Sequence, residues 1–581
     1  MSTTDPVLVP AYPLNADSDQ GHFARFEPGA RVLPAGFQVD ERFMPLPVDI
    51  VLDKDVAIVL RDGVTIRADV FRPAGAGKVP VIVGWSPYGK SRGNAPIYVR
   101  IFEMLGMDTR SVSGLMRFEG PDPAFWCAHG YAVCNPDPRG SFHSDGDIRV
   151  WSRKEGEDYH DVIEWAAAED WCTGKVGTSG NSYLAISQWF AAAEQPPHLA
   201  AIAPWEGMSD IYRDLVMRGG IPDYPFPRTL ERSFVGKNGR EDLVAEAERH
   251  PLLDGFWQNK IPAFEKIAVP AYVVASYSNS IHTPGTFRGW RRIASPDKWL
   301  RIHNTMEWPD YYDQRNLDDL LRFFDCYLKG EDNGWRQTPR VRYAVLDLEG
   351  GDRVNQPASA FPPEGVTLQK YYLDALSGSL QGEATEAQGT ATYDGASADG
   401  CASFTVRVDA PTEFVGYPRV RLFVEADGCD DIDLFVLLQK LDEHGTPLEQ
   451  FNVPNQGPQM DALTRQGAAI LKYKGSNGRL RVSMRHLDEA ASTDEIPVHS
   501  FDRVEKLAQG EVACVDVDLF PIGLALRPGQ QLRLILSGEH LLGGVMPGTD
   551  NVPNANTGTH VIHTGGRYAS YLQLPLKRTD A

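Results

Sequence analysis

Short, continuously apolar segments alternate with helical stretches over the first 345 residues, and this alternation most limits how the chain can fold. Strands that are apolar on both faces and separated by helices form mostly parallel sheets covered on both sides. An α/β domain is therefore expected. Its predicted strands are residues 79–84, 131–135, 175–178, 199–204, 271–276 and 299–303, with helices such as 159–169 between them.

The regular spacing is interrupted between the fourth and fifth of these strands. Residues 208–266 are rich in charged and aromatic side chains and are predicted to be helical. An insertion at this point would lie over the carboxyl ends of the strands, where α/β sheets bind ligands. We therefore predict a helical cap. A hairpin around Arg61-Asp62-Gly63 precedes the α/β pattern, and residues 1–45 are expected to form an irregular arm.

After the predicted helix at 317–328 the pattern changes to many short strands without helices between them. They are expected at 403–408, 419–425, 433–441, 512–520, 531–536 and 568–574, and 382–400 is expected to be a flexible loop. Such a pattern predicts an all-β sandwich of the jelly-roll kind. The predicted organisation is an arm (1–45), an α/β core (46–207 and 267–345) with its cap (208–266), and the β-sandwich (346–581).

Composition excludes several classes of partner. With 57 basic and 78 acidic residues the formal net charge is −21, which argues against nucleic acid. No apolar run of about 18 residues predicts a membrane span, and residues 1–13 lack the features of a signal peptide. Seven scattered cysteines suit a reducing compartment, so a cytoplasmic location is expected. A homo-oligomer is compatible with the sequence.

The strongest local motif is Lys175-Val176-Gly177-Thr178-Ser179-Gly180-Asn181-Ser182-Tyr183-Leu184-Ala185. A strand runs directly into a helical stretch with Ser182 at the junction, which is the arrangement of a nucleophile elbow. The sharp turn would lift the serine oxygen clear of the sheet, and the following amide, at Tyr183, would face an oxyanion. The strict G-x-S-x-G form is not met, because Leu184 stands at the last glycine.

Several motifs in chain order resemble the cocaine esterase, α-amino acid ester hydrolase and X-Pro dipeptidyl peptidase family of serine hydrolases. The matching segments are Trp85-Ser86-Pro87-Tyr88-Gly89, Asp137-Pro138-Arg139-Gly140 with Ser144-Asp145-Gly146, the helix from Glu157 to Trp165, Gly180-Asn181-Ser182-Tyr183-Leu184-Ala185, Lys298-Trp299-Leu300-Arg301-Ile302-His303 and Phe323-Phe324-Asp325. The resemblance implies an α/β-hydrolase domain with a cap, followed by a C-terminal jelly roll.

The resemblance also implies a division of catalytic roles. Ser182 would attack the carbonyl carbon of the substrate, and His303 would take the serine proton and pass it to the leaving group. The Tyr88 hydroxyl and the Tyr183 amide would stabilise the oxyanion. No cofactor and no metal are expected, because His143 and His160 lack ligands at metal-binding spacing.

The family's acidic residue is missing from its usual loop. Residues 277–285 contain no carboxylate, and Asn279 stands where the aspartate is expected. Asn279 would accept a hydrogen bond from the histidine but supply no charge. The alternatives are an acid at Glu206, one at Glu307 or Asp310 just after His303, or a changed or lost activity.

Three residues near the end of the fourth strand are candidates for substrate binding. They are Trp205, Glu206 and Asp210. In the amino-ester hydrolase branch that the chain resembles, carboxylates near the cap bind a substrate ammonium, and Glu206 or Asp210 would do so here. The predicted function is hydrolysis of a small-molecule carboxylic ester or amide through an acyl-serine. The alternatives are acyl transfer and a catalytically silent binding protein.

Overall fold

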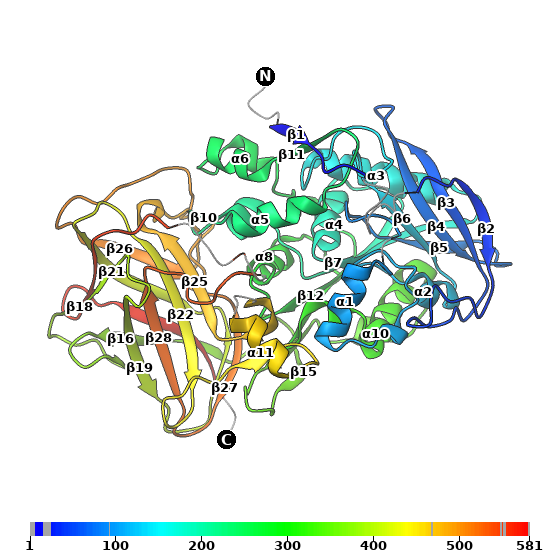
Figure 1. The fold of residues 1–581 in the computed structure, drawn as a ribbon. Helices are drawn as coiled ribbons and strands as arrows, with labels where there is room; N and C mark the ends of the chain where they lie inside the picture. The colour runs from blue at the N-terminus through cyan, green and yellow to red at the C-terminus, as the bar shows by residue number, and fades with distance from the viewer. Residues whose placement is uncertain are drawn as a thin grey trace.

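A computed structural model describes residues 6–14, 25–91, 93–465, 469–545, 549 and 554–578. Figure 1 shows two parts side by side, an N-terminal part of helices and strands and a C-terminal part made mostly of strands. Within the described residues no helix is long and apolar enough to span a bilayer.

The N-terminal part is built on one sheet of eleven strands. Its order is β15-β14-β13-β12-β8-β7-β5-β6-β4-β3-β2, and the seven strands from β14 to β6 are mutually parallel. The strands are β2 (Gly29–Leu33), β3 (Ile50–Val59), β4 (Thr65–Pro73), β5 (Val79–Val83), β6 (Ala132–Asp137), β7 (Cys172–Asn181), β8 (Leu199–Trp205), β12 (Ala271–Ser276), β13 (Lys298–His303), β14 (Val341–Val345) and β15 (Arg353–Ala358).

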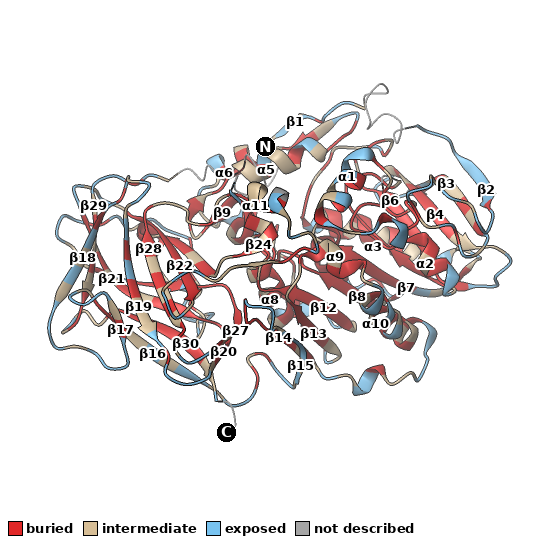
Figure 2. Cartoon of the chain, turned by 60° about the horizontal axis from the view of Figure 1, so that its bottom comes forward, coloured by how far each residue is buried: buried red, intermediate tan, exposed pale blue. Residues whose placement is uncertain are grey.

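Helices cover this sheet, as the alternation in the sequence predicts. They are α1 (Pro96–Leu105), α2 (Pro123–Ala128), α3 (Arg153–Ala168), α4 (Tyr183–Ala193), α8 (Thr283–Arg292), α9 (Glu307–Tyr311) and α10 (Gln314–Phe324). Ser152 caps the start of α3 by accepting a hydrogen bond from the Glu155 amide, and the Tyr159 ring stacks on Trp85 at 4.7 Å between centroids. Figure 2 shows that the sheet and the inner faces of its helices form a continuous buried core.

The segment between β8 and β12 is not helical throughout. Its elements are a π-helix (Tyr212–Val216), β9 (Met217–Arg218), β10 (Ile221–Pro222), α5 (Pro225–Leu230), a 3-10 helix (Glu231–Ser233), β11 (Gly239–Glu241), α6 (Leu243–Arg249), α7 (Gly255–Gln258) and a second 3-10 helix (Phe264–Lys266). The short strands arise through pairing with distant or adjacent segments. Thus β11 pairs with β1 (Leu8–Pro10) from the predicted arm, a contact that local periodicity does not reveal.

Three other segments differ from the expected organisation. The arm also contains β2, which pairs with β3 as the edge strand of the large sheet. At the predicted boundary β15 still belongs to that sheet, because it pairs with β14. Residues 389–394, in the expected loop, form β18. Strands β2 and β15 are mostly exposed, so they lack the apolar positions that reveal a strand. Strand β18 alternates, but its residues are small or polar apart from Tyr393.

The C-terminal part contains thirteen hydrogen-bonded strands among the described residues. They are β16 (Val366–Asp374), β17 (Ser379–Gln381), β18 (Gly389–Asp394), β19 (Cys401–Arg407), β20 (Thr412–Gly416), β21 (Arg419–Asp427), β22 (Asp433–Leu441), β25 (Ser476–Arg481), β26 (Ala513–Asp518), β27 (Ile522–Leu526), β28 (Gln531–Ser537), β29 (Thr559–Thr564) and β30 (Tyr571–Lys577). The strand-rich character is confirmed, and the jelly-roll connectivity stays a prediction. A separate pair, β23 (Gln450–Phe451) and β24 (Lys472–Tyr473), flanks α11 (Pro458–Arg465).

A buried ionic cluster ties together the strands at one side of the large sheet. The Lys90 ammonium lies 2.8 Å from Asp55, 3.6 Å from Asp69 and 3.8 Å from Asp137, which come from β3, β4 and β6. Arg117 lies 3.9 Å from the same Asp137 carboxylate. All five side chains are 3% exposed or less, so each charge depends on its neighbours for compensation.

Replacing Lys90 with Met should lower the free energy of unfolding by about 3–5 kcal/mol, because it leaves buried carboxylates without their ammonium. Lys154→Met is the matched control. Its ammonium pairs with Asp62 at 3.0 Å but is 31% exposed, so its loss should cost less than about 1 kcal/mol. Urea unfolding of both variants measures the difference, and equal destabilisation would contradict a structural role for the buried cluster.

Candidate active site

Ser182 stands between β7 and α4 in a strained backbone conformation. Its φ of 53° and ψ of −119° lie outside the regions that L-residues favour, and its amide donates to the Glu206 carbonyl oxygen at 3.0 Å. The turn requires glycine at 180, where φ is 141° and a Cβ would lie 2.5 Å from the Leu184 Cβ. These are the features of a nucleophile elbow.

The elbow of the family that the chain resembles reads G-x-S-Y-x-G, one residue longer than the strict G-x-S-x-G form. Its final glycine position is Ala185 here, and Gly207 makes room for the alanine. A Cβ on Gly207 would lie 2.8 Å from the Ala185 Cβ and 3.1 Å from the Ile186 amide nitrogen. Because residue 207, on the chain after β8, is a glycine, α4 packs closely against that chain although residue 185 is an alanine. The departure from the strict motif is compatible with the elbow.

Two donors predicted for the oxyanion lie beside Ser182. A side-chain hydrogen bond joins Tyr88 to Ser182, and burial raises the pKa of the Tyr88 phenol well above its ordinary value, so the hydroxyl keeps its proton. The Tyr183 amide is the first in α4 and has no acceptor within that helix. The Tyr183 side chain points elsewhere, donating to the Glu155 carboxylate at 2.8 Å.

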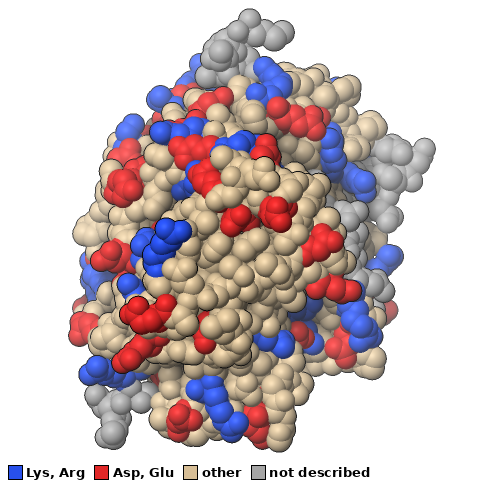
Figure 3. Space-filling model, turned by 90° about the vertical axis from the view of Figure 1, so that its left-hand side faces the viewer, with Lys and Arg blue, Asp and Glu red and all other residues tan. Residues whose placement is uncertain are grey.

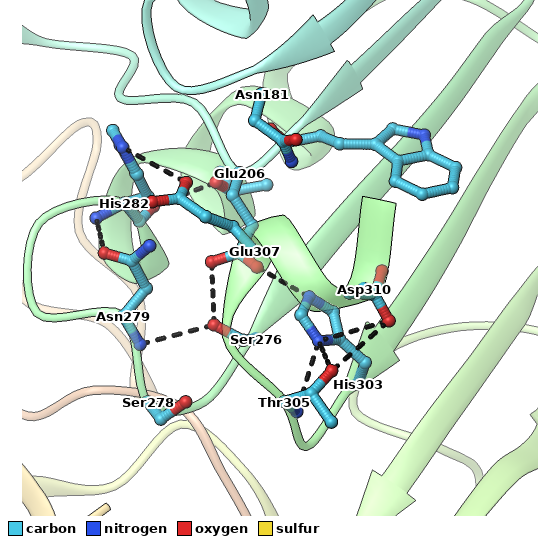
Figure 4. Close-up of polar contacts among 12 residues, drawn as sticks. Asn181, Glu206, Ser276, Ser278, Asn279, His282, His303, Thr305, Glu307 and Asp310 are labelled. Carbon is cyan, nitrogen blue, oxygen red and sulfur yellow. Dashed lines mark hydrogen bonds and ion pairs between the residues drawn. The ribbon is translucent and has the colours of Figure 1, made fainter. Parts of the chain in front are cut away.

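His303 is the last residue of β13, and both of its ring nitrogens face oxygens other than that of Ser182 (Figure 4). Its Nε2 lies 2.6 Å from Glu206 Oε1. Its Nδ1 lies 3.1 Å from the Thr305 hydroxyl and 3.5 Å from Asp310. No hydrogen bond joins His303 to Ser182 within the part of the chain that the structure describes.

Among the described residues no hydrogen bond joins Asn279 to His303 either. Its side-chain oxygen accepts the backbone amides of Ile281 and His282, each at 3.2 Å, and so closes its own loop. Of the acids considered from the sequence, Glu206 is the one whose carboxylate contacts the histidine most closely, and Asp310 is engaged by Arg301. The structure therefore brings Glu206, rather than Asn279, to His303.

A group of buried carboxyls surrounds the elbow, and sequence reasoning missed one of them, Glu119. The Glu119 carbonyl accepts the Asn181 amide at 3.1 Å, and its carboxylate accepts the Trp308 indole N–H at 2.9 Å. Burial raises the pKa of Glu119 to about 8. Burial also raises the pKa of Glu307, with Glu206 and Glu119 adding to the shift. The sequence around Glu119 did not reveal its place at the elbow, because its unusual φ of 67° is seen only in the folded chain.

The other residues predicted to bind substrate already have partners in the structure. Trp205 is fully buried, with its ring 5.5 Å from Tyr272 and 5.2 Å from Tyr311, so it packs in the core. Asp210 pairs with Arg213 at 2.6 Å in the wall of a cavity of about 620 Å³, whose lining includes residues of both domains. Binding of a substrate ammonium by Asp210 or Glu206 stays a prediction.

A serine at such an elbow, on a sheet of this order, defines a serine hydrolase with the α/β-hydrolase fold. Comparison with known families agrees. Residues 62–238 match the X-Pro dipeptidyl-peptidase (S15 family) model, and residues 333–573 match the X-Pro dipeptidyl-peptidase C-terminal non-catalytic domain.

The chain belongs to the CocE/NonD family of hydrolases. It is 33% identical to a CocE/NonD family hydrolase from Staphylococcus aureus, covering 96% of this chain and 98% of that one with a TM-score of 0.86. The cocaine esterase of Rhodococcus sp. (strain MB1 Bresler) is 34% identical over 159 residues, which are 27% of this chain and 24% of that esterase. An α-amino acid ester hydrolase shares the fold, with 17% identity, a TM-score of 0.67 and coverage of 91% and 96%.

Replacing Gly180 with Ala should both destabilise the protein and reduce the reactivity of Ser182. The new Cβ would meet Leu184 and the Glu119 carbonyl, 2.8 Å away, so the elbow must shift at a cost of about 1–3 kcal/mol. Gly77→Ala is the control, because a Cβ there would have nothing within 4 Å and its φ is not positive. Urea unfolding and fluorophosphonate labelling report the two effects, and a fully reactive Gly180→Ala protein would contradict the required turn.

Proposed function

We propose that this hydrolase cleaves a carboxylic ester of a small molecule through an acyl intermediate on Ser182. The observation that carries the proposal is the strained elbow, which holds Ser182 next to the Tyr88 hydroxyl and the first amide of α4. Attack by the serine oxygen converts the carbonyl oxygen into an oxyanion, and these two donors would stabilise it. An amide substrate of the same shape remains an alternative.

The serine proton needs an acceptor at this site. His303 is the residue that the sequence predicts for the role, and its two ring nitrogens are engaged by Glu206 and by Thr305 with Asp310. Glu206 and Asp210 remain candidates to bind a positively charged group on the substrate. Their present partners, His303 and Arg213, would have to be exchanged for that group.

We expect the enzyme to act in the cytoplasm on a small-molecule substrate and to bind no nucleic acid. All seven cysteines are free, four of them buried, which supports a reducing compartment. On the face shown in Figure 3 basic and acidic side chains are interspersed. That face offers no continuous basic surface of the kind that a phosphate backbone requires.

Intact-mass labelling with a fluorophosphonate tests the nucleophile. The wild-type protein should gain one adduct, and Ser182→Ala should gain none. Tyr88→Phe should lower the acylation rate by about 100- to 1000-fold, since it removes one oxyanion donor. Tyr327→Phe is the control, because that hydroxyl donates to Asp297 instead. If the folded wild-type protein gained no adduct, the result would favour the alternative of a catalytically silent binding protein.

Acyl transfer is separated from hydrolysis by the products. With a p-nitrophenyl ester and an added primary alcohol or amine, a hydrolase should release only the free carboxylic acid, because water captures the acyl-serine. Chromatography of the products measures the partition at increasing concentrations of the nucleophile. Dominant formation of the new ester or amide at millimolar nucleophile would move the assignment to an acyltransferase.

A further inference from the structure

Helix α3 begins beside the two segments that carry the predicted oxyanion donors. Figure 1 shows α3 next to α4. Gly156 lets the two helices approach closely, since a Cβ there would lie 2.7 Å from the Phe190 carbonyl oxygen. One turn further along α3, the Tyr159 hydroxyl donates to the Val83 carbonyl at the end of β5 at 3.0 Å. The start of α3 is therefore held against both β5 and α4.

Glu155 is the third residue of α3, and with Ser152 it has the S-x-x-E form of a capping box. In that motif the glutamate carboxylate bonds to the amide of the capping serine. Here the carboxylate has other partners. Its Oε2 accepts the Trp151 amide at 2.5 Å, and its Oε1 accepts both the Trp85 indole N–H and the Tyr183 hydroxyl, each at 2.8 Å.

The two partners of Oε1 belong to the segments that would stabilise the oxyanion. Trp85 lies in the turn after β5, three residues before Tyr88. Tyr183 is the first residue of α4, and its amide is the other predicted donor. The rings of Tyr88 and Tyr183 meet edge to face, with 5.7 Å between their centroids. One carboxylate oxygen therefore joins the two segments.

The Glu155 carboxylate depends on these neutral donors for its stability. The residue is 4% exposed, and within the part of the chain that the structure describes no lysine or arginine forms an ion pair with it. Lys260, whose charge acts on Glu155, is paired with Glu241 at 2.7 Å. Burial raises the pKa of Glu155 to about 7, although its three donors oppose the shift. Hydrogen bonds to an ionised carboxylate are short and strong, so they hold their partners firmly.

We propose that Glu155 is a positioning residue of the oxyanion site, which holds the turn of Tyr88 and the start of α4 at a fixed separation. This inference rests on the acyl-serine function proposed above. Two donors act together only if each lies about 2.7–3.1 Å from the oxyanion, so the segments that carry them need a constant spacing. Glu155 provides it through Trp85 and Tyr183, and not by contact with the substrate.

A glutamine at position 155 cannot reproduce the three hydrogen bonds. Whichever way its amide turns, the NH2 group replaces an acceptor and faces a donor. A nitrogen in place of Oε2 faces the Trp151 amide, and a nitrogen in place of Oε1 faces both Trp85 and Tyr183. Glu155→Gln therefore keeps the volume of the side chain and should shift the two segments relative to each other.

The test is the pre-steady-state acylation rate of the full-length protein with p-nitrophenyl acetate at about pH 8.5, where Glu155 is ionised. Glu155→Gln should lower this rate by about 10- to 100-fold, because a donor misplaced by about 1 Å has a cost of this order. The apparent Kd of the ester should change by less than about threefold, since only the transition state carries the oxyanion. Glu157→Gln on the same helix is the control. Its side chain is 26% exposed and pairs with Arg153 and Lys154, so its rate should stay within about twofold of wild type.

Inhibition by a trifluoromethyl ketone separates a role at the oxyanion from a general loss of structure. The adduct of this ketone with Ser182 carries the oxyanion, so in Glu155→Gln its inhibition constant should rise by the same factor as the acylation rate falls. Tyr183→Phe keeps the amide donor and removes the hydroxyl. It should cost about tenfold in the wild type and less than about threefold in Glu155→Gln, because the two groups act as a pair. Losses that multiply independently would contradict this pairing.

The variants also separate failure of this inference from failure of the proposed function. Thermal unfolding shows whether Glu155→Gln is folded, and Tyr183→Phe tests the same contact if it is not. Acylation of folded Glu155→Gln within about threefold of wild type, or an unchanged rate in Tyr183→Phe, would overturn the role of Glu155 and leave the acyl-serine function intact. Acylation that persists in Ser182→Ala would overturn the acyl-serine function itself.

Discussion

The hydrogen bond from the Ser182 amide to the Glu206 carbonyl is the contact on which the site depends. This hydrogen bond lies one residue beyond the last pair of the β7–β8 ladder, which joins Asn181 to Trp205. Ser182 and Glu206 both have a φ of 53°, so each chain turns sharply away from the sheet just after this contact. The two turns place Ser182 and Glu206 at the same edge of the sheet. The surrounding sheet offsets the energetic cost of their strained backbone.

Placing several carboxyl groups around this edge has a cost, because each loses hydration and repels the others. Glu206 offsets it through His303 and the Ser276 hydroxyl, and Asp310 through Arg301. Among the described residues no lysine or arginine pairs with Glu119 or Glu307, and both acids have raised pKa values. The acids of the site thus form two groups. Glu206 and Asp310 contact His303 or Arg301, whereas no lysine or arginine that the structure describes lies beside Glu119 or Glu307.

The sequence predicted the parallel strands and the sharp strand-to-helix turn at Ser182, because short-range periodicity and small neighbours determine them. Tyr88 was identified through the family resemblance alone, and its role as an oxyanion donor stays a prediction. The sequence did not show which side chains surround His303, and the role of His303 as proton acceptor stays a prediction. His303 ends its strand as expected, yet its ring orientation depends on Glu206, 97 positions earlier in the chain. Glu119 lies in a loop with no motif and reaches the elbow through a backbone contact. Such contacts follow from the register of the assembled sheet, which local patterns do not encode.

The C-terminal domain takes part in placing α9 and the loop after β12. The Met306 amide, just before Glu307, donates to the Asn452 carbonyl at 2.6 Å, and the Asn452 side chain donates to the Ser278 hydroxyl at 3.0 Å. Met306 also packs with Leu105 of α1 and Met460 of α11, and Figure 1 shows α11 close to α1. A domain without the nucleophile thus helps to position two segments of the α/β domain, the one that carries Glu307 and the loop that carries Asn279.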